Sequence, residues 1–143
     1  MYNLGTKAYQ AYKNAATTTA SPGQLVLMLY DGALRFLEQA KKGFEYEDPL
    51  KFNETINNNI LKAQAIINEL NLCLDIKNGG ELAQHMRRIY LYCDDRLLYA
   101  NIHKDINLLN DVIKRLEILR NAWAEMLSVR ESNGAFNSLG SAQ

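Results

Sequence analysis

The spacing of apolar residues constrains the fold of this chain more than any other feature. In three stretches, apolar side chains recur at steps of three and four residues. Such steps keep side chains on one face of an α-helix, because a helix turns once in about 3.6 residues. Each stretch therefore predicts the buried face of one long helix. The series are Phe52, Ile56, Ile60, Ala63, Ile67, Leu70 and Leu74; Leu82, Met86, Ile89, Cys93, Leu97 and Ala100; and Leu109, Val112, Leu116, Leu119, Trp123 and Met126.

Helix start and stop signals divide the chain into four helices. A serine or aspartate before a proline marks the start of a helix, and a glycine marks its end. Gln24, three residues after Ser21, can complete a capping box with it. The predicted helices run from Ser21–Pro22 to about Lys42, from Asp48–Pro49 to the pair Gly79–Gly80, from Glu81 to about His103, and from Asp105 to about Arg130. Short links make consecutive long helices antiparallel. We therefore predict an all-α fold, an antiparallel up-down four-helix bundle.

The two ends of the chain differ from this body in composition. Residues 1–20 are polar, rich in threonine and alanine, and carry three tyrosines. Residues 131–143 have the glycine- and serine-rich composition of a frayed terminus. We expect one domain over residues 21–130, with a flexible N-terminal arm over residues 1–20 and a disordered, flexible tail over residues 131–143.

Bulk composition excludes several classes of protein. The 143 residues carry no formal net charge, which argues against a nucleic-acid partner. No apolar run approaches the roughly 18–20 residues that span a bilayer, so direct membrane insertion is not expected. The N-terminus has no apolar core of a secretion signal, and Cys73 and Cys93 lie far apart without a ligand pattern. We expect a cytoplasmic protein with reduced thiols.

The residues that could carry catalysis do not converge. Glu81 and His85 stand one helical turn apart, but a metal site needs three or four ligands. Cys93 lies on a core stripe without an adjacent histidine to activate it. Asp94 and Asp95 are consecutive and point in different directions from a helix. We therefore expect no enzyme activity, no metal and no cofactor.

The third helix has more apolar surface than a bundle needs. At about 100° per residue, Leu91, Leu98 and Ile102 fall on a stripe opposite the core series, and Tyr92 and Tyr99 flank it. The second helix repeats the pattern more weakly, at Leu61, Ala65, Leu72 and Ile76. Exposed apolar patches with tyrosines often mark partner sites. Alternatively, these positions pack against the chain's own ends or form the seam of a homodimer.

Two segments carry a resemblance to a known family. The first contains Ala8–Tyr12 and then Thr19–Ala33, with Leu-Met-Leu-Tyr-Asp-Gly following the Ser-Pro cap as its most specific part. The second runs through Arg96–Asn101, Lys104–Ile106 and Leu116–Trp123. Up to about Met126, with no large insertion, the chain resembles the flagellin-specific export chaperones.

The resemblance implies a cytosolic four-helix chaperone that binds the disordered C-terminal region of flagellin in apolar grooves. In that family, such binding prevents premature polymerisation of flagellin and aids its delivery to the flagellar type III export gate. The N-terminal segment is also implicated in contacts with other flagellar regulators. The same resemblance places Tyr9 and Tyr12 in an arm that can cover the binding surface, together with Tyr30 of the first helix. The main alternative remains a structural helical-bundle homodimer.

Overall fold

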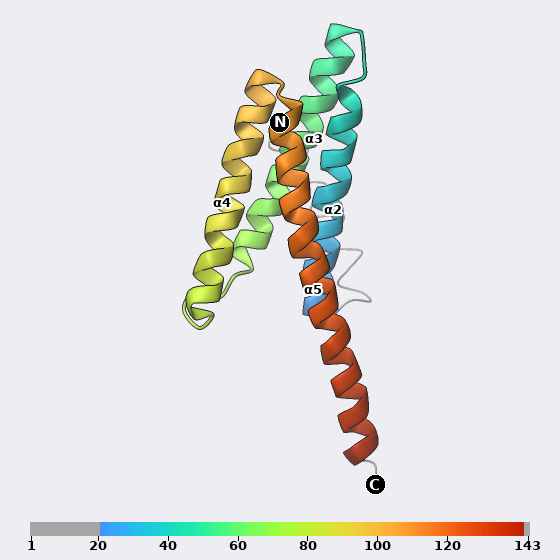
Figure 1. Cartoon of the computed structure of the whole chain (residues 1–143), viewed down its shortest axis with the longest axis vertical. Helices are drawn as coiled ribbons and strands as arrows, with labels where there is room; N and C mark the ends of the chain where they lie inside the picture. The colour runs from blue at the N-terminus through green and yellow to red at the C-terminus, as the bar shows by residue number, and fades with distance from the viewer. Residues whose placement is uncertain (1–20, 142–143) are drawn as a thin grey trace.

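The computed structural model describes residues 21–141 of the chain, with side chains over residues 21–134. Within this range there are four helices and no strand: α2 (Pro22–Gly43), α3 (Pro49–Leu72), α4 (Gly80–His103) and α5 (Ile106–Ser141). Consecutive helices run in opposite directions (Figure 1). The prediction of an all-α, up-down four-helix bundle is confirmed.

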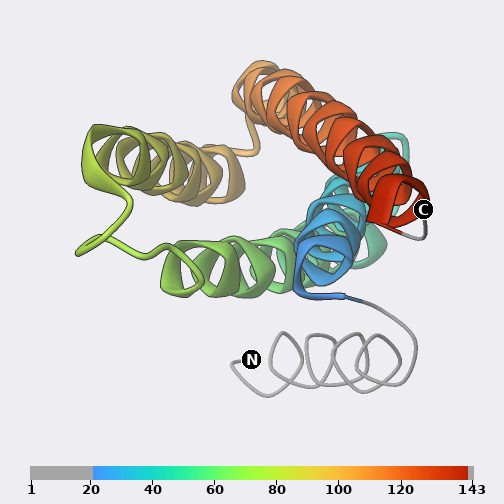
Figure 2. The same cartoon turned by 90° about the horizontal axis from the view of Figure 1, so that it is seen from below.

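The four helices form a ring. Helix α2 packs against α3 and α5, and α4 packs against the same two helices from the other side. The α2–α3 contact is the most extensive of the four, and the two contacts made by α4 are the least extensive. Seen from below, α4 stands apart from α2 (Figure 2). Helix α4 is therefore the most weakly attached member of the bundle.

The predicted caps begin the helices. The hydroxyl of Ser21 accepts a hydrogen bond from the backbone N–H of Gln24 (3.2 Å), and the carboxylate of Asp48 accepts one from that of Lys51 (3.0 Å). These bonds satisfy backbone donors that have no partner within the helix. The side-chain amide of Gln24 donates instead to Glu131 of α5 (2.7 Å), so it ties the start of α2 to α5.

Two helix ends differ from the prediction. Helix α3 ends at Leu72, well before the glycine pair, because Asp75 organises a separate turn by accepting hydrogen bonds from Asn78. Helix α5 continues to Ser141, beyond the predicted end near Arg130. No proline follows Arg130, and each of the two glycines beyond it, Gly134 and Gly140, costs only about 1 kcal/mol inside a helix.

The predicted core series are largely buried, with two exceptions. The core consists of residues from all four helices, including Leu29, Leu37, Ile56, Ile60, Ile67, Leu97, Leu109 and Leu116, all 1% exposed or less. However, Leu82 is 71% exposed and Met126 is 38% exposed. Leu82 belongs to the first turn of α4 and Met126 to the second half of α5, and these parts of the two helices diverge (Figure 1), so the predicted seam does not close at this end of the bundle.

None of the helices in the described part of the chain combines the length and the apolar character needed to cross a membrane.

Candidate partner-binding surface

The apolar stripe predicted on the far side of α4 is exposed. Leu91 is 54% exposed, Leu98 is 49% exposed and Ile102 is 64% exposed. These residues lie within about 40° of one another around the helix, opposite the buried Cys93 and Leu97. An exposed leucine forgoes about 1.5–3 kcal/mol of burial energy, so a row of them is a feature to be explained.

Two polar contacts fix how this stripe lies against α3. The side-chain amide of Asn101 donates to Asn57 (2.9 Å), and that of Gln64 donates to the carbonyl of Asp94 (3.4 Å). This antiparallel register places the half-buried Leu61 of α3 level with Leu98 of α4. We call the apolar surface along these two helices the α3–α4 face; its residues are Leu61, Leu72, Leu91, Leu98 and Ile102.

The two predicted tyrosines lie on the other side of α4, beside α5. The hydroxyl of Tyr92 donates to the Asp111 carboxylate (3.2 Å), and the Arg115 guanidinium carbon lies 4.7 Å from the centre of the Tyr92 ring. Arg96 stands over the Tyr99 ring at 4.9 Å. The structure thus separates the predicted binding set into an apolar stripe on the outer side of α4, level with Leu61 of α3, and a tyrosine–arginine seam on the side of α5.

The arginines of this seam were not among the predicted site residues. Arg115 forms an ion pair with Asp111 one turn earlier (3.1 Å), and Arg96 pairs with the adjacent Asp95 (2.8 Å). The four-residue spacing of Asp111 and Arg115 is a sequence signal that could have indicated a charged helix face. Guanidinium groups over aromatic rings are common in protein interfaces.

The expectation that Tyr30 belongs to a groove cap is corrected. Tyr30 is 1% exposed and lies in the bundle core, where its hydroxyl is hydrogen-bonded to that of Tyr90. Burial raises the pKa of both phenols, so both stay protonated and neutral. Tyr30 therefore links α2 to α4 across the ring. The other two tyrosines of this set, Tyr9 and Tyr12, lie outside the described residues.

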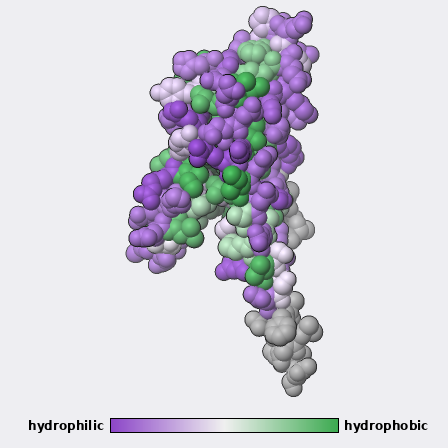
Figure 3. Space-filling model, in the orientation of Figure 1, coloured by the Kyte–Doolittle hydropathy of each residue, from purple (hydrophilic) through white to green (hydrophobic). Residues whose placement is uncertain are grey.

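A second apolar surface lies where α4 and α5 diverge. We call it the fork; it consists of the exposed Leu82 and Met126 with the half-buried Met86, Ile89, Leu119 and Trp123. In the space-filling view, hydrophobic side chains gather between the two helices at this level (Figure 3). The Trp123 indole N–H donates to the carbonyl of Gly23 (2.9 Å), which fixes this ring at the edge of the fork.

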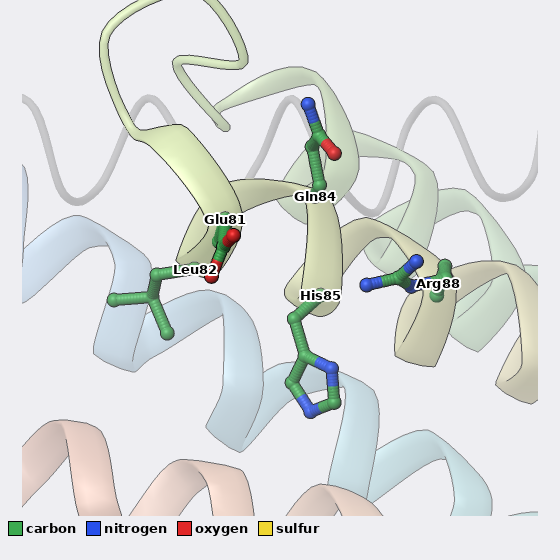
Figure 4. A pocket seen from close by; sticks show the side chains of 5 residues that line it. All are labelled: Glu81, Leu82, Gln84, His85 and Arg88. Atoms are coloured by element: carbon green, nitrogen blue, oxygen red, sulfur yellow. The ribbon is translucent and has the colours of Figure 1, made fainter.

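The fork side of α4 carries a shallow pocket without a metal site. Its lining residues are Glu81, Leu82, Gln84, His85 and Arg88. Leu82 and His85 extend to the side where α2 and α5 are drawn, whereas Gln84 points the opposite way (Figure 4). Among the residues that the structure describes, no group of three or more histidine, cysteine, aspartate or glutamate side chains could hold a metal ion.

The thiol beneath the apolar stripe of α4 is not a nucleophile at neutral pH. Cys93 is fully buried, and burial raises its pKa to about 11. A thiol with such a pKa is protonated at neutral pH, and the thiolate is the reactive form. What the two surfaces offer is therefore apolar and aromatic contact area.

Comparison with known proteins identifies the family. The family described as Flagellar protein FliS matches residues 5–130. The flagellar secretion chaperone FliS of Bacillus subtilis (strain 168) is 39% identical over 119 residues, which cover 83% of this chain and 85% of the relative. The FliS chaperone of Salmonella typhimurium (strain LT2) is 35% identical over 123 residues, which cover 85% and 89% of the two chains. This chain therefore belongs to the flagellar protein FliS family.

Proposed function

We propose that this protein is a cytosolic export chaperone that binds the disordered C-terminal region of flagellin, keeps it from polymerising early and aids its delivery to the flagellar type III export gate. The relatives are named flagellar secretion chaperones, which supports the role in export. The observation that carries the binding proposal is the exposed α3–α4 face, since none of the helices in residues 21–141 covers its row of leucines.

The binding mode is helix-in-groove capture. An amphipathic segment of the partner lays its apolar residues on Leu91, Leu98 and Ile102, whose spacings of seven and four residues correspond to two turns and one turn of a helix. Tyr92 and Tyr99 at the α5 edge supply contact area and hydroxyl groups for hydrogen bonds. Ordering a disordered partner costs about 2–5 kcal/mol or more, so a broad contact surface is needed.

The test is isothermal titration with a peptide covering the C-terminal region of the host's flagellin. We expect one-to-one binding with a negative heat-capacity change, which is the signature of apolar burial. The Leu98→Asp variant should lose about 2 kcal/mol of binding energy, roughly thirtyfold in affinity, because a charge replaces a central apolar anchor.

Leu50→Asp is the matched control. Leu50 is exposed to a similar degree but lies in the first turn of α3, away from the α3–α4 face. The Leu50→Asp variant should bind the peptide as the wild type does. If Leu98→Asp is folded by circular dichroism and also binds as wild type does, the α3–α4 face is not the site.

A homodimer that buries the same leucines is the competing explanation. Light scattering of the purified chain separates the two. A stable dimer whose formation is abolished by Leu98→Asp, together with no binding of the flagellin peptide, would replace the chaperone proposal with self-association.

A further inference from the structure

The two halves of α4 are held in different ways. From Tyr90 onward, side chains hydrogen-bond to each of the other helices: Tyr90 to Tyr30 of α2, Asn101 to Asn57 of α3, and Tyr92 to Asp111 of α5. Within the described part of the chain, residues 80–89 make no hydrogen bond or ion pair to another helix. Among the described residues, the contacts that attach the first turns of α4 to the other helices are therefore apolar.

The two sides of these first turns differ in burial. Ala83 precedes Asn101 by 18 residues, which is about five helical turns, so both residues face the side of α3. Ala83 is 6% exposed, whereas its neighbour Leu82, which faces the core and the fork, is exposed. Met86 and Ile89, on the same side of α4 as Leu82, are only half-buried. One side of α4 is packed at this end, and the side toward α5 is open.

The link from α3 allows α4 to move as a unit. The backbone bonds that extend α3 end with Leu74 N–H to Asn71 (3.2 Å). A separate turn then begins, closed by Gly79 N–H to the Asp75 carbonyl (2.7 Å). It leads into α4 through Gly80, whose φ of 59° suits glycine. The turn and α4 thus form one continuous segment, and its junction with α3 lies between Leu74 and Asp75.

We propose that α4 rocks between α3 and α5 about its anchored C-terminal half, and that this motion regulates the α3–α4 face. In the second position, Leu82 packs against Met126 and Trp123, and the fork is closed. Because α4 lies between α3 and α5 in the ring, closing the fork moves its first turns away from α3. The α3–α4 face then widens between Leu72 and Leu91. The regulatory part of the proposal rests on the proposed function.

A disulfide trap tests the motion. In a Cys73→Ser background, which removes the exposed native thiol, Leu82→Cys and Met126→Cys are combined in the full chain. A disulfide requires Cα atoms within about 7 Å, a condition that the closed fork meets. Rocking of a helix takes microseconds to milliseconds and disulfide formation takes seconds or longer, so the closed position is captured. The pair should be completely oxidised by a mild glutathione redox buffer.

The control pair is Asn57→Cys with Asn101→Cys, at side chains that already touch in the anchored half. It should oxidise faster than the fork pair. Trp123 is the only tryptophan, so its emission reports on the fork and should shift to shorter wavelength on oxidation of the fork pair alone. If the control pair oxidises and the fork pair stays reduced, α4 does not rock and the proposal is overturned.

The oxidised fork variant then tests regulation. It should bind the flagellin C-terminal peptide at least about fivefold more tightly than the same variant after reduction, the lower end of typical coupling between two sites. Equal affinity in the two redox forms would overturn the regulatory link. Complete oxidation without peptide binding in either form would refute the proposed function and the regulation together, while the rocking motion itself would stand.

Discussion

The two ends of the bundle use the same four helices and bury their apolar residues to different degrees. At one end α2 and α4 finish and α3 and α5 begin, and eight inward residues are 0% exposed: Leu37, Ala40, Ile56, Ile60, Leu97, Ala100, Leu109 and Val112. We call this the closed end. At the opposite, open end, α3 still buries Ile67 and Leu70, but between α4 and α5 the burial is incomplete: Met86, Leu119 and Trp123 are half-buried, and Leu82 and Met126 are exposed.

This difference separates stability from binding within a small domain. The closed end has the dense packing that makes large contributions to the free energy of folding. The open end has fewer buried contacts and therefore opens at lower free-energy cost, as surfaces that accept partners generally do. The α3–α4 face extends from the closed end at Leu61 and Leu98 to the open end at Leu72 and Leu91, so a bound segment would contact both.

The largest expected effect is the difference between a leucine at each end. Leu97→Ala should lower the free energy of unfolding by about 2–5 kcal/mol, because it removes methyl groups from a fully buried site and leaves a cavity. Leu72→Ala, at a side chain that is 68% exposed, should change it by less than about 0.5 kcal/mol. Urea unfolding followed by circular dichroism measures both. Equal losses would mean that the open end is as well packed in solution as the closed end.

A smaller effect is expected at the hydrogen bond that joins α2 to α4. Tyr90→Phe leaves the buried Tyr30 hydroxyl without its partner, and this should cost about 1–3 kcal/mol. The double variant with both phenylalanines should be more stable than the sum of the single effects predicts, since no polar group is then left unpaired. A double-mutant cycle from urea unfolding measures this coupling. Additive losses would show that the two hydroxyls do not interact in solution.

Most of the fold could be predicted from the sequence because its signals are local. The caps at Ser21 and Asp48 and the three- and four-residue steps of the core series depend only on residues within a turn or two. The exposure of Leu91, Leu98 and Ile102 also follows from their angle around α4.

The openness of one end could not be predicted in the same way. Leu82 lies on the same stripe of α4 as the buried Cys93, and nothing in helical periodicity states how far α4 and α5 diverge. Similarly, an angle around α4 does not say which neighbour a side chain meets, so Tyr92 was placed with the leucines although it contacts Asp111 of α5. Tyr30 was assigned by resemblance alone, and its burial depends on a partner sixty residues away.

The helix caps allow a finer comparison of the two ends. Asp48→Ala, at the closed end, should cost about 1 kcal/mol, a typical value for the loss of an N-cap. Ser21→Ala, at the open end, should cost at least as much, because the first turn of α2 is half-buried and hydrogen-bonded to α5 through Gly23 and Gln24, whereas the first turn of α3 is exposed. Urea unfolding of the two variants side by side measures the difference. A smaller loss for Ser21→Ala would mean that these contacts with α5 do not hold the start of α2 in solution.

The smallest effect concerns pH and the turn before α4. The backbone N–H of Asn78, together with its side-chain amide, holds the pKa of Asp75 below its ordinary value of 3.8. A depressed carboxyl pKa contributes stability above the ordinary value, and that contribution is lost as the pH falls through the folded value. Asp75 is fully exposed, so the contribution is small. Carboxyl NMR titration should give a pKa below 3.8, and Asp75→Asn should remove the associated acid sensitivity.

The location of this acid sensitivity matters more than its size. Protonation of Asp75 weakens the turn that carries the start of α4, and it leaves the closed end unchanged. Amide exchange at Asn78 and Gly79, corrected for the intrinsic pH dependence of exchange, should therefore become less protected in acid, whereas the amide of Ile60 in the closed end should keep its protection. A parallel loss of protection at Ile60 would show that the two ends unfold as one unit, and the distinction between them would then be one of burial alone.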